Sequence, residues 1–449
     1  MHDLESGPQA AWAGHSRRAL GPVFWLLFGV GLIGMLLCAA ALTASEAADK
    51  DTAMTSKPLE RMNRFKMKEF LIGSWCFHGS YDEAYCRAYR EAGFNTMVDA
   101  PTVLDDARKT GLKVIISTIV HPVFDKSGKI VPGKFTLGPY ARLADLKWFQ
   151  EEYGKHPALI GYLLNDNCQL HDYTIECAKW MAQNAPGLYP YMSHNPDPAG
   201  QAKVVEWMPI LSSQNYPYGY HNEWPEAQKR REFCDRLEAD RAHANENDMV
   251  LWPIFAALGK PNLGASQIRF QAFSSIGYGA QALFYFAYSS NRPVWKKTGT
   301  AFQATKYCND YIARVVGPRV LGHRCIGVYH TPLDGDVPKG ALTPGQGKLI
   351  EQMDDALLAG VLVRESEFKA KKQTPVYIVV VDKRTASEGE KDPEARAAHL
   401  TFGSSVRGVE ILGAGEHRSG KVDGRAVSLN LKGGDGVLLK ITPANPDGK

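Results

Sequence analysis

Short apolar segments alternate with longer amphipathic segments eight times between residues 68 and 324. Several of these segments, such as residues 114–117, are continuous runs of mostly β-branched residues, as expected of strands that are buried on both faces. The segments between them carry helix signals, such as the glycines Gly93 and Gly111 at their ends. Eight successive strand–helix units close naturally into a parallel barrel because each crossover is right-handed. The sequence therefore predicts an α/β fold, a (β/α)8 TIM barrel over residues 68–324.

The apolar segments give the expected positions of the elements. We expect barrel strands at residues 70–75, 95–98, 114–117, 158–164, 188–192, from 209, 250–257 and 283–288. We expect helices at residues 80–93, 104–109, 140–153, 172–183, 225–244, 266–277 and 301–316. A doubly wound open sheet is the alternative, but no strand is followed by the G-x-G-x-x-G motif of a dinucleotide site.

After Cys325 the pattern changes to short alternating strands separated by glycine-rich turns, most clearly at residues 433–436. The expected strands lie at residues 326–330, 360–363, 375–381, 399–402, 409–412, 426–431 and 437–441. Residues 334–348 and 388–396 are expected to form loops. This pattern is typical of a small antiparallel β-sandwich, which we expect over residues 325–449.

The amino-terminal segment indicates export. Residues 22–42 are apolar and uncharged, and as a helix they would span about 31 Å, enough to cross a bilayer. Arg17 and Arg18 precede this run, which predicts a cytoplasmic segment at residues 1–19 and export of the rest. Small residues at 45–47 suit a cleavage site, so residues 20–47 are either a signal peptide or a transmembrane anchor. Residues 48–67 then form a linker, and the protein is membrane-anchored facing outside the cytoplasm, or periplasmic or secreted.

Charge and cysteine content exclude several classes of function. The 449 residues carry 52 Lys and Arg against 48 Asp and Glu, a net charge of +4 without a basic stripe. We therefore expect no nucleic-acid partner. The seven cysteines after Cys38 contain no C-x-x-C pair, which predicts mostly buried thiols rather than a zinc or redox site. No motif predicts a cofactor.

Barrel enzymes place their sites at the carboxyl ends of the strands. In this sequence those positions are rich in amides, imidazoles and aromatic rings, which suit the hydroxyls and apolar faces of sugars. The candidate substrate-binding residues are Trp75, His78, His121, Asn165, Asn167, His194, Asn215, Tyr216, Trp252 and Tyr285.

These candidates have structural alternatives. A metal cluster of His78, His121 and His194 is not expected, because no H-x-H or H-E-x-x-H motif accompanies them. Trp252 and Tyr285 are as well explained by packing in the barrel core. Asp99, which ends the second strand, has helix capping as its alternative to catalysis.

Three motifs, taken in order, resemble a known class of enzymes. They are H-P-A-L-I-G-Y at residues 156–162, Arg269 with G-Y-G-A at residues 277–280, and G-D-G-V-L-L-K-I at residues 434–441. Over residues 68–442 the chain resembles the (β/α)8-barrel glycoside hydrolases of the clan that contains bacterial β-galactosidases and cellulases. The last motif is similar to the final strand of their accessory β-sandwich.

The resemblance implies two catalytic glutamates, and neither is present. The acid/base glutamate is expected six residues after Gly161, where this chain has Asn167 preceded by Asp166. The nucleophile is expected near the end of the seventh strand, where residues 254–258 contain no acid. An amide cannot exchange a proton with a leaving group, so Asn167 cannot act as the general acid/base.

Three hypotheses follow. In the first, the chain is an active glycosidase with displaced acids, using Asp166 as acid and Asp99 as base or nucleophile. In the second, it binds carbohydrate without turnover. In the third, it breaks a polysaccharide by elimination, with Tyr216 or His121 as base. A purely structural envelope protein is the remaining alternative. Strand alternation places Asp166 and Asn167 on opposite faces, unless a bulge turns Asp166 inward.

Overall fold

The computed structural model describes residues 67–76, 82–118, 120–124, 130–137, 141–166, 172–193, 207–221, 223–258, 262–288, 295–372, 374–413 and 419–444. The predicted leader, residues 20–47, lies outside them. Within the described residues no helix is both long and apolar enough to cross a membrane. These residues belong to one compact unit.

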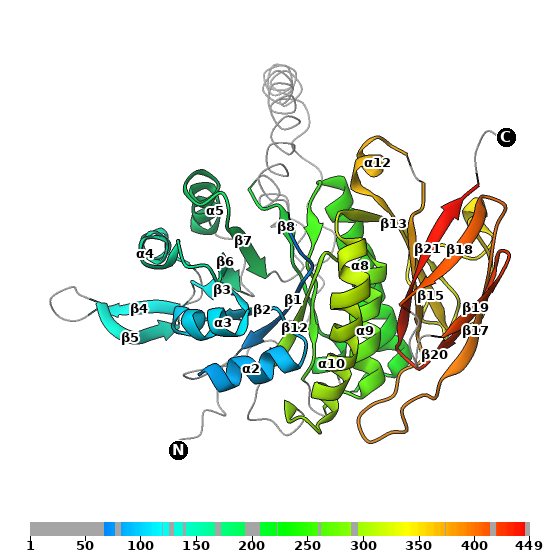
Figure 1. Ribbon diagram of the computed structural model, residues 1–449, viewed down its shortest axis with the longest axis horizontal. Coiled ribbons are helices and arrows are strands. Elements are labelled where there is room, and N and C mark those ends of the chain that lie inside the picture. The colour runs from blue at the N-terminus through cyan, green and yellow to red at the C-terminus, as the bar shows by residue number, and fades with distance from the viewer. Residues whose placement is uncertain are drawn as a thin grey trace, which may run out of the picture. The chain divides into compact units, whose positions relative to one another are not determined.

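Eight parallel strands form the nearly closed barrel that the sequence predicts (Figure 1). Around the barrel they are β7 (Tyr189–Ser193), β6 (Leu159–Asp166), β3 (Lys113–Ser117), β2 (Thr96–Asp99), β1 (Leu71–Cys76), β12 (Ala282–Tyr288), β11 (Ile254–Ala256) and β9 (Gln214–Asn215). A second parallel pair is formed by β8 (Ile210–Leu211) and β10 (Val250–Leu251). In the chain, β8 directly precedes β9 and β10 directly precedes β11. The prediction of a (β/α)8 barrel is confirmed.

The barrel has a seam between β7 and β9, which are the two ends of the ordered sheet. Polar side chains connect the two edges there. Ser212 Oγ donates to Tyr191 OH at 3.2 Å, and Gln214 Nε2 donates to Ser193 Oγ at 2.6 Å. At the seam, side-chain hydrogen bonds therefore take the place of the backbone hydrogen bonds that join the other strands.

Helices cover the outside of the barrel. The main ones are α2 (Glu83–Glu91), α3 (Leu104–Thr110), α4 (Leu143–Tyr153), α5 (Asp172–Asn184), α8 (Glu226–Glu246), α9 (Ala265–Gly277) and α10 (Thr300–Tyr311). Short helical segments are η1 (Pro101–Val103), α7 (Pro217–Tyr220), η3 (Ile312–Val316) and α11 (Gly317–Val320). Helix α2 begins later than expected because Asp82 is its N-cap and accepts a hydrogen bond from Tyr85 N at 2.9 Å.

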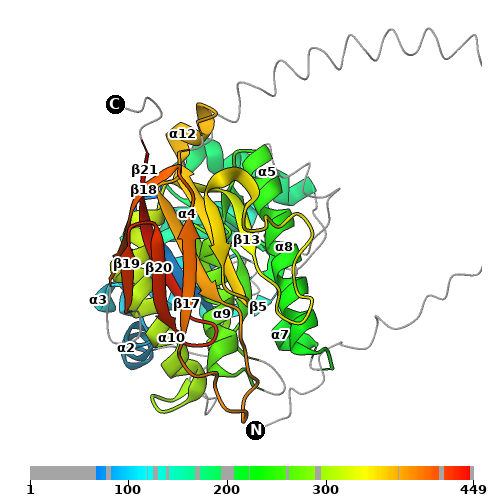
Figure 2. The ribbon, with the colours of Figure 1, turned by 90° about the vertical axis from the view of Figure 1, so that its right-hand side faces the viewer.

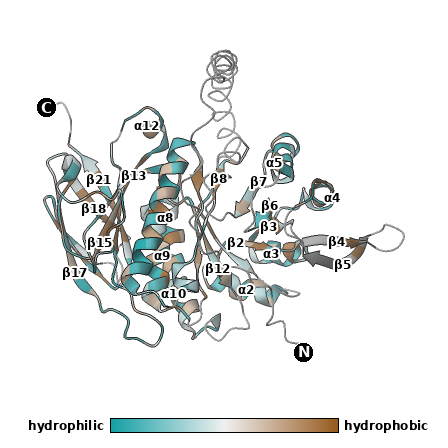
Figure 3. Ribbon diagram, turned by 180° about the vertical axis from the view of Figure 1, so that it is seen from behind, coloured by the Kyte–Doolittle hydropathy of each residue, from teal (hydrophilic) through white to brown (hydrophobic). Residues whose placement is uncertain are grey.

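Two apolar cores hold the barrel together. Aromatic rings fill its interior, where Trp252 packs on Tyr191 and Phe284 with centroid distances of 5.8 and 5.7 Å. A larger core lies between the strands and the helices. In Figure 3 the strands β2, β7 and β8 have hydrophobic colours, whereas much of α8 is hydrophilic. Gly161 is required where β6 approaches β7, because a Cβ atom there would lie 2.5 Å from Tyr189 O.

The carboxyl-terminal part forms the expected β-domain of two antiparallel sheets (Figure 2). One sheet contains β13 (His323–His330), β15 (Leu357–Arg364), β16 (Tyr377–Asp382), β21 (Gly436–Pro443) and β18 (Val406–Leu412). The other contains β14 (Ile350–Met353), β17 (Arg396–Phe402), β20 (Ala426–Leu431) and β19 (Gly420–Asp423). A separate apolar core, including Val380 and Phe402, packs between the sheets.

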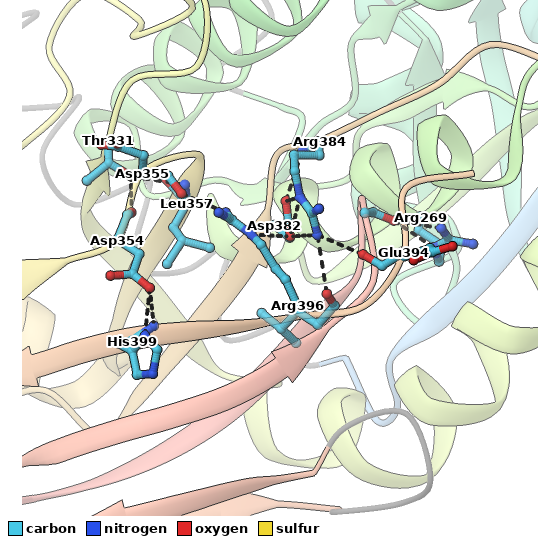
Figure 4. A network of polar contacts seen from close by, with 12 residues as sticks. Arg269, Thr331, Asp354, Asp355, Leu357, Asp382, Arg384, Glu394, Arg396 and His399 are labelled. Atoms are coloured by element: carbon cyan, nitrogen blue, oxygen red, sulfur yellow. Dashed lines mark hydrogen bonds and ion pairs between the residues drawn. The ribbon is translucent and has the colours of Figure 1, made fainter. Parts of the chain in front are cut away.

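Helix α9 packs against the β-domain at very short range. A Cβ atom on Gly360 of β15 would lie 1.9 Å from Gly277 O at the end of α9. Arg269 of α9 donates to Gly433 O and, at 2.7 Å, to Asp392 Oδ2. Figure 4 shows this arginine beside the network in which Arg384 and Arg396 donate to the buried carboxylate of Asp382. The part of the chain that resembles the helix-seven signature thus includes an inter-domain contact.

A buried ion cluster forms a second contact between the two domains. Asp336 Oδ2 accepts from Arg230 Nε of α8 at 2.8 Å, and Asp336 Oδ1 accepts from Lys383 Nζ at 2.5 Å. All three side chains are almost fully buried. Two positive charges therefore share one carboxylate at this interface.

The segments that sequence analysis missed are short or lie in expected loops. Strands β4 (Val120–Phe124) and β5 (Ile130–Leu137) pair as a hairpin after the third barrel strand. Strands β14 and β19 each have only four residues. The remaining small elements are η4 (Gln346–Lys348) and α12 (Glu365–Lys369). Five cysteines, Cys86, Cys177, Cys234, Cys308 and Cys325, are buried thiols.

Candidate functional site

Asp166, the last residue of β6, faces the barrel interior because the strand is irregular just before it. Leu163 packs in the interior core, whereas Leu164 packs in the core under the helices. Asn165 also faces the helices, since its Nδ2 lies 3.4 Å from Thr174 Oγ1 of α5. The β6–β7 register shifts between Leu163 and Asn165. This irregularity turns Asp166 back inward, as a bulge does.

Two neighbouring side chains hold Asp166 at the seam. Gln214 Nε2 of β9 donates to Asp166 Oδ1 at 3.0 Å. Burial raises the pKa of Asp166 to about 6, while the hydrogen bonds from Ser193 and Gln214 act in the opposite direction. The carboxyl group therefore exchanges its proton near neutral pH, which is the property required of a general acid or base.

Aromatic rings lie beside this carboxyl group. The ring of Tyr216 lies 5.0 Å from Phe286 of β12 and 5.5 Å from Tyr220 of α7, measured between centroids. The Tyr216 hydroxyl is buried and has no hydrogen-bond partner in the described part of the chain. Burial and the charge of Asp166 raise the pKa of Tyr216 well above its ordinary value. Tyr216 therefore stays protonated, so its hydroxyl can donate a hydrogen bond but does not act as a base.

Asp99, the other predicted catalytic acid, lies on a different face. It ends β2 two residues after Met97, whose side chain packs under the helices, whereas Val98 packs inside the barrel. Burial raises the pKa of Cys86 on α2, and the charges of Asp106 and then Asp99 raise it further. Strand β3 separates β2 from β6. The structure therefore does not bring Asp99 and Asp166 together as a catalytic pair.

Asp99 does not cap the following helix, because the N-cap of η1 is Ala100 and no side chain caps η1 or α3. The Oδ1 atom of Asp99 accepts from Ala100 N at 2.6 Å, next to the short helix η1. Burial raises the pKa of Asp99 to about 8, and only the Ala100 hydrogen bond lowers it. The Oδ2 atom has no hydrogen-bond partner among the described residues. A neutral carboxyl that orders the backbone after β2 accounts for these contacts.

Several predicted ligand-binding residues make internal contacts instead. Tyr285 OH donates to Asn309 Oδ1 of α10 at 2.8 Å, and Asn215 Nδ2 donates to Phe233 O of α8 at 2.9 Å. Trp252 is fully buried, and its Nε1 lies 3.3 Å from Met67 Sδ. Asn165 faces α5, as described above. Each of these four side chains is directed into the packed core, and a ligand contact for them stays a prediction.

The other predicted residues divide into two groups. Trp75 lies in the barrel interior with its ring 6.3 Å from Tyr191, close to the seam. His78, Asn167 and His194 lie outside the described residues, and of His121 only the backbone in β4 is described. Their roles remain predictions. Within the described residues no group of three His, Cys, Asp or Glu side chains could hold a metal ion.

The contacts that position Asp166 were not predicted from the sequence, although Gln214 was expected at the end of the sixth strand. Ser193 and Gln214 come from strands β7 and β9, and Gln214 lies 48 positions from Asp166. Tyr220 and Phe286 complete the aromatic surroundings. The signal in the sequence was the cluster of polar and aromatic residues after the sixth strand, but it does not reveal which of them reach across the seam.

Comparisons with known proteins find only distant likenesses in structure. No family model and no curated protein matches its sequence. Among solved structures, an α-amylase from H. orenii has a TM-score of 0.46 and 7% identity, covering 84% of this chain and 100% of that one. An α-L-fucosidase isoenzyme 2 from Paenibacillus thiaminolyticus has a TM-score of 0.49 and 7% identity with the same coverage. A glycoside hydrolase family 5 mannosidase from Rhizomucor miehei has a TM-score of 0.40 and 12% identity, covering 56% and 95%. These likenesses identify neither a substrate nor an activity.

Proposed function

We propose that this chain is an exported glycoside hydrolase-like protein that acts on an oligo- or polysaccharide at the carboxyl-terminal rim of its barrel. The observation that carries the proposal is Asp166, an inward-facing carboxyl at a strand end with a pKa of about 6. A rim with amide, hydroxyl and aromatic groups around one such acid suits sugar recognition. Export rests on the apolar leader of the sequence alone.

Asp166 is the general acid of the proposed reaction. At pH 6 about half of these carboxyl groups are protonated. The protonated group can donate its proton to the glycosidic oxygen as the C–O bond breaks, while a water oxygen bonds to the anomeric carbon and the proton of that water returns to the Asp166 carboxylate. Hydrogen bonds from Gln214, on Oδ1, and from Ser193 fix the orientation of the carboxyl group. Tyr216 supplies a buried hydroxyl as a hydrogen-bond donor.

The second candidate function is carbohydrate binding without turnover. Retaining and inverting hydrolases both need two carboxylates, about 5–5.5 Å or 6.5–9.5 Å apart. In the described part of the chain the pKa of Asp166 responds to burial, Ser193 and Gln214, and no acidic neighbour contributes. This observation specifically favours a binding protein. Elimination with Tyr216 as base is disfavoured by the raised pKa of that residue.

The experiment compares release with binding. Full-length protein is incubated with laminarin, glucomannan, xylan, galactan and carboxymethylcellulose, and reducing ends and bound polysaccharide are measured separately. We expect Asp166→Asn to reduce release by about 10²–10⁴-fold with little change in binding. Asp99→Asn is the matched control and should leave release within about twofold, because Asp99 faces the helices.

Each other outcome has a defined meaning. Binding without release in the unmodified protein supports the second candidate function. Release that survives Asp166→Asn removes Asp166 from the mechanism. Unsaturated products indicate elimination, and the absence of both binding and release from every polysaccharide rejects the carbohydrate proposal.

A further inference from the structure

Tyr220 is the one aromatic side chain among the described residues that is largely exposed to solvent. Its exposed fraction is 55%, and the other exposed large apolar side chain is Val422, at 41%, on strand β19 of the β-domain. Every other described Phe, Tyr or Trp residue is buried or half-buried. Tyr220 ends α7, directly after strand β9, and so belongs to the rim of the barrel.

The helix that carries Tyr220 is tightly anchored. Tyr218 is buried with its ring 6.2 Å from both Phe233 of α8 and Phe270 of α9. A Cβ atom on Gly219 would lie 2.9 Å from Ala256 Cβ, at the end of β11. One side of α7 is therefore fixed by the fold, while Tyr220 projects from its end. The exposure of Tyr220 is a property of a rigid segment.

Tyr220 also lies close to the proposed catalytic acid. Its ring is 5.5 Å from that of Tyr216. Burial raises the pKa of both hydroxyls, and the charge of Asp166 raises it further. Beyond it in the chain, His221 and Trp224 stack with a centroid distance of 3.7 Å and an interplanar angle of 5°. A second aromatic stack thus follows Tyr220 along the chain.

We propose that Tyr220 is the stacking platform of a sugar-binding subsite beside Asp166, so that the ligand is a chain of at least two sugar units that extends over α7. The inference rests on the proposed function and deepens it by naming the substrate class. The apolar C–H face of a pyranose packs on an aromatic ring, which makes an exposed tyrosine at a rim suitable for this contact. A protein that acted on single terminal sugars would not need this ring.

The test uses the full-length protein with cello-, laminari-, manno- and xylo-oligosaccharides of one to six units. We expect affinity to rise when the chain becomes long enough to reach Tyr220. Tyr220→Ala should remove that rise, weakening binding of the long oligosaccharides about tenfold. It should leave binding of the shortest ones unchanged, and where there is turnover it should raise KM with kcat retained. Tyr220→Phe keeps the ring and should behave as the unmodified protein.

Val422→Ala removes the other exposed apolar side chain and is the matched control for surface effects. If Tyr220→Ala binds long oligosaccharides as tightly as Val422→Ala does, the subsite is rejected. If, in addition, Asp166→Asn loses the release of reducing ends, the subsite is rejected but the proposed function is supported. If no oligosaccharide binds and Asp166→Asn changes nothing, both fail. Equal melting temperatures for both alanine variants show that the ring is not needed for folding.

Discussion

Gln214 Nε2 lies 3.0 Å from Asp166 Oδ1, and this hydrogen bond joins β9 to β6 across the seam of the barrel. The same nitrogen donates to Ser193 Oγ of β7 at 2.6 Å. One amide group thus connects three strands at the position where the sheet ladder is interrupted. The seam and the proposed site coincide, so the residues that close the barrel also set the chemistry of Asp166.

Gln214 should control the pH dependence of any hydrolysis. As a general acid, Asp166 is active when protonated, so activity should fall as the pH rises through about 6. The Gln214 hydrogen bond lowers the pKa of Asp166. Gln214→Met removes this donor, and we expect the falling limb of kcat/KM to move to higher pH. The exposed Gln303 of α10 offers a control, Gln303→Met, for which the limb should stay in place. A limb that moves to lower pH would contradict this assignment.

Asp99 should make the fold less stable as the pH rises. Its pKa is about 8 in the folded protein, above the ordinary value of 3.8. The unfolded chain therefore loses this proton first, and the free energy of unfolding falls between about pH 4 and pH 8. Asp99→Asn lacks this proton exchange. Urea unfolding should show that, between pH 4 and pH 8, the free energy of unfolding of the unmodified protein falls more than that of Asp99→Asn. We expect the difference between the two falls to exceed about 1.4 kcal/mol. Asp105→Asn, an exposed aspartate of α3, is the control, and parallel pH curves for the two variants would count against the prediction.

Gly360→Ala should severely destabilise the contact between α9 and the β-domain. The added methyl group would overlap Gly277 O, a backbone atom that cannot move without displacing α9. We expect a loss of about 1–3 kcal/mol or more in denaturant unfolding. Gly408→Ala on strand β18 is the matched control, because its nearest neighbour would be Thr442 Cβ at 3.8 Å, an ordinary contact. Similar stabilities for the two variants would show that the helix and sheet can separate freely.

Asp336→Asn should unfold the interface between α8 and the β-domain. Arg230 and Lys383 share the carboxylate of Asp336, and all three are buried. Without that charge Lys383 loses its counter-ion and Arg230 keeps only its ion pair with Asp334. Removing one partner from such a buried ion cluster typically costs about 3–5 kcal/mol. Glu394→Gln breaks the exposed pair with Lys391 and should cause no measurable change in melting temperature. The interpretation fails if the two variants melt at the same temperature.

The order of elements follows from local patterns that the chain carries without tertiary information. Strands such as β3 and β6 are continuous apolar runs, and Gly111 ends α3 with a positive φ of 73°. The β4–β5 hairpin was missed because its segments lack the clean alternation of a half-buried strand. Strands β14 and β19 were missed because four residues give too short a pattern for a period to be visible.

The amino-acid sequence by itself determined the strand–helix alternation, the change to β-structure near residue 325 and the presence of Asp166 at a strand end. Only the tertiary structure decided that Asp166 faces the interior while Asp99 faces the helices. A side chain's direction at a strand end depends on register, and one irregular residue reverses it. The shift between Leu163 and Asn165 is fixed by pairing with β7. The partner Gln214 comes from a distant strand, so no local pattern could have shown it.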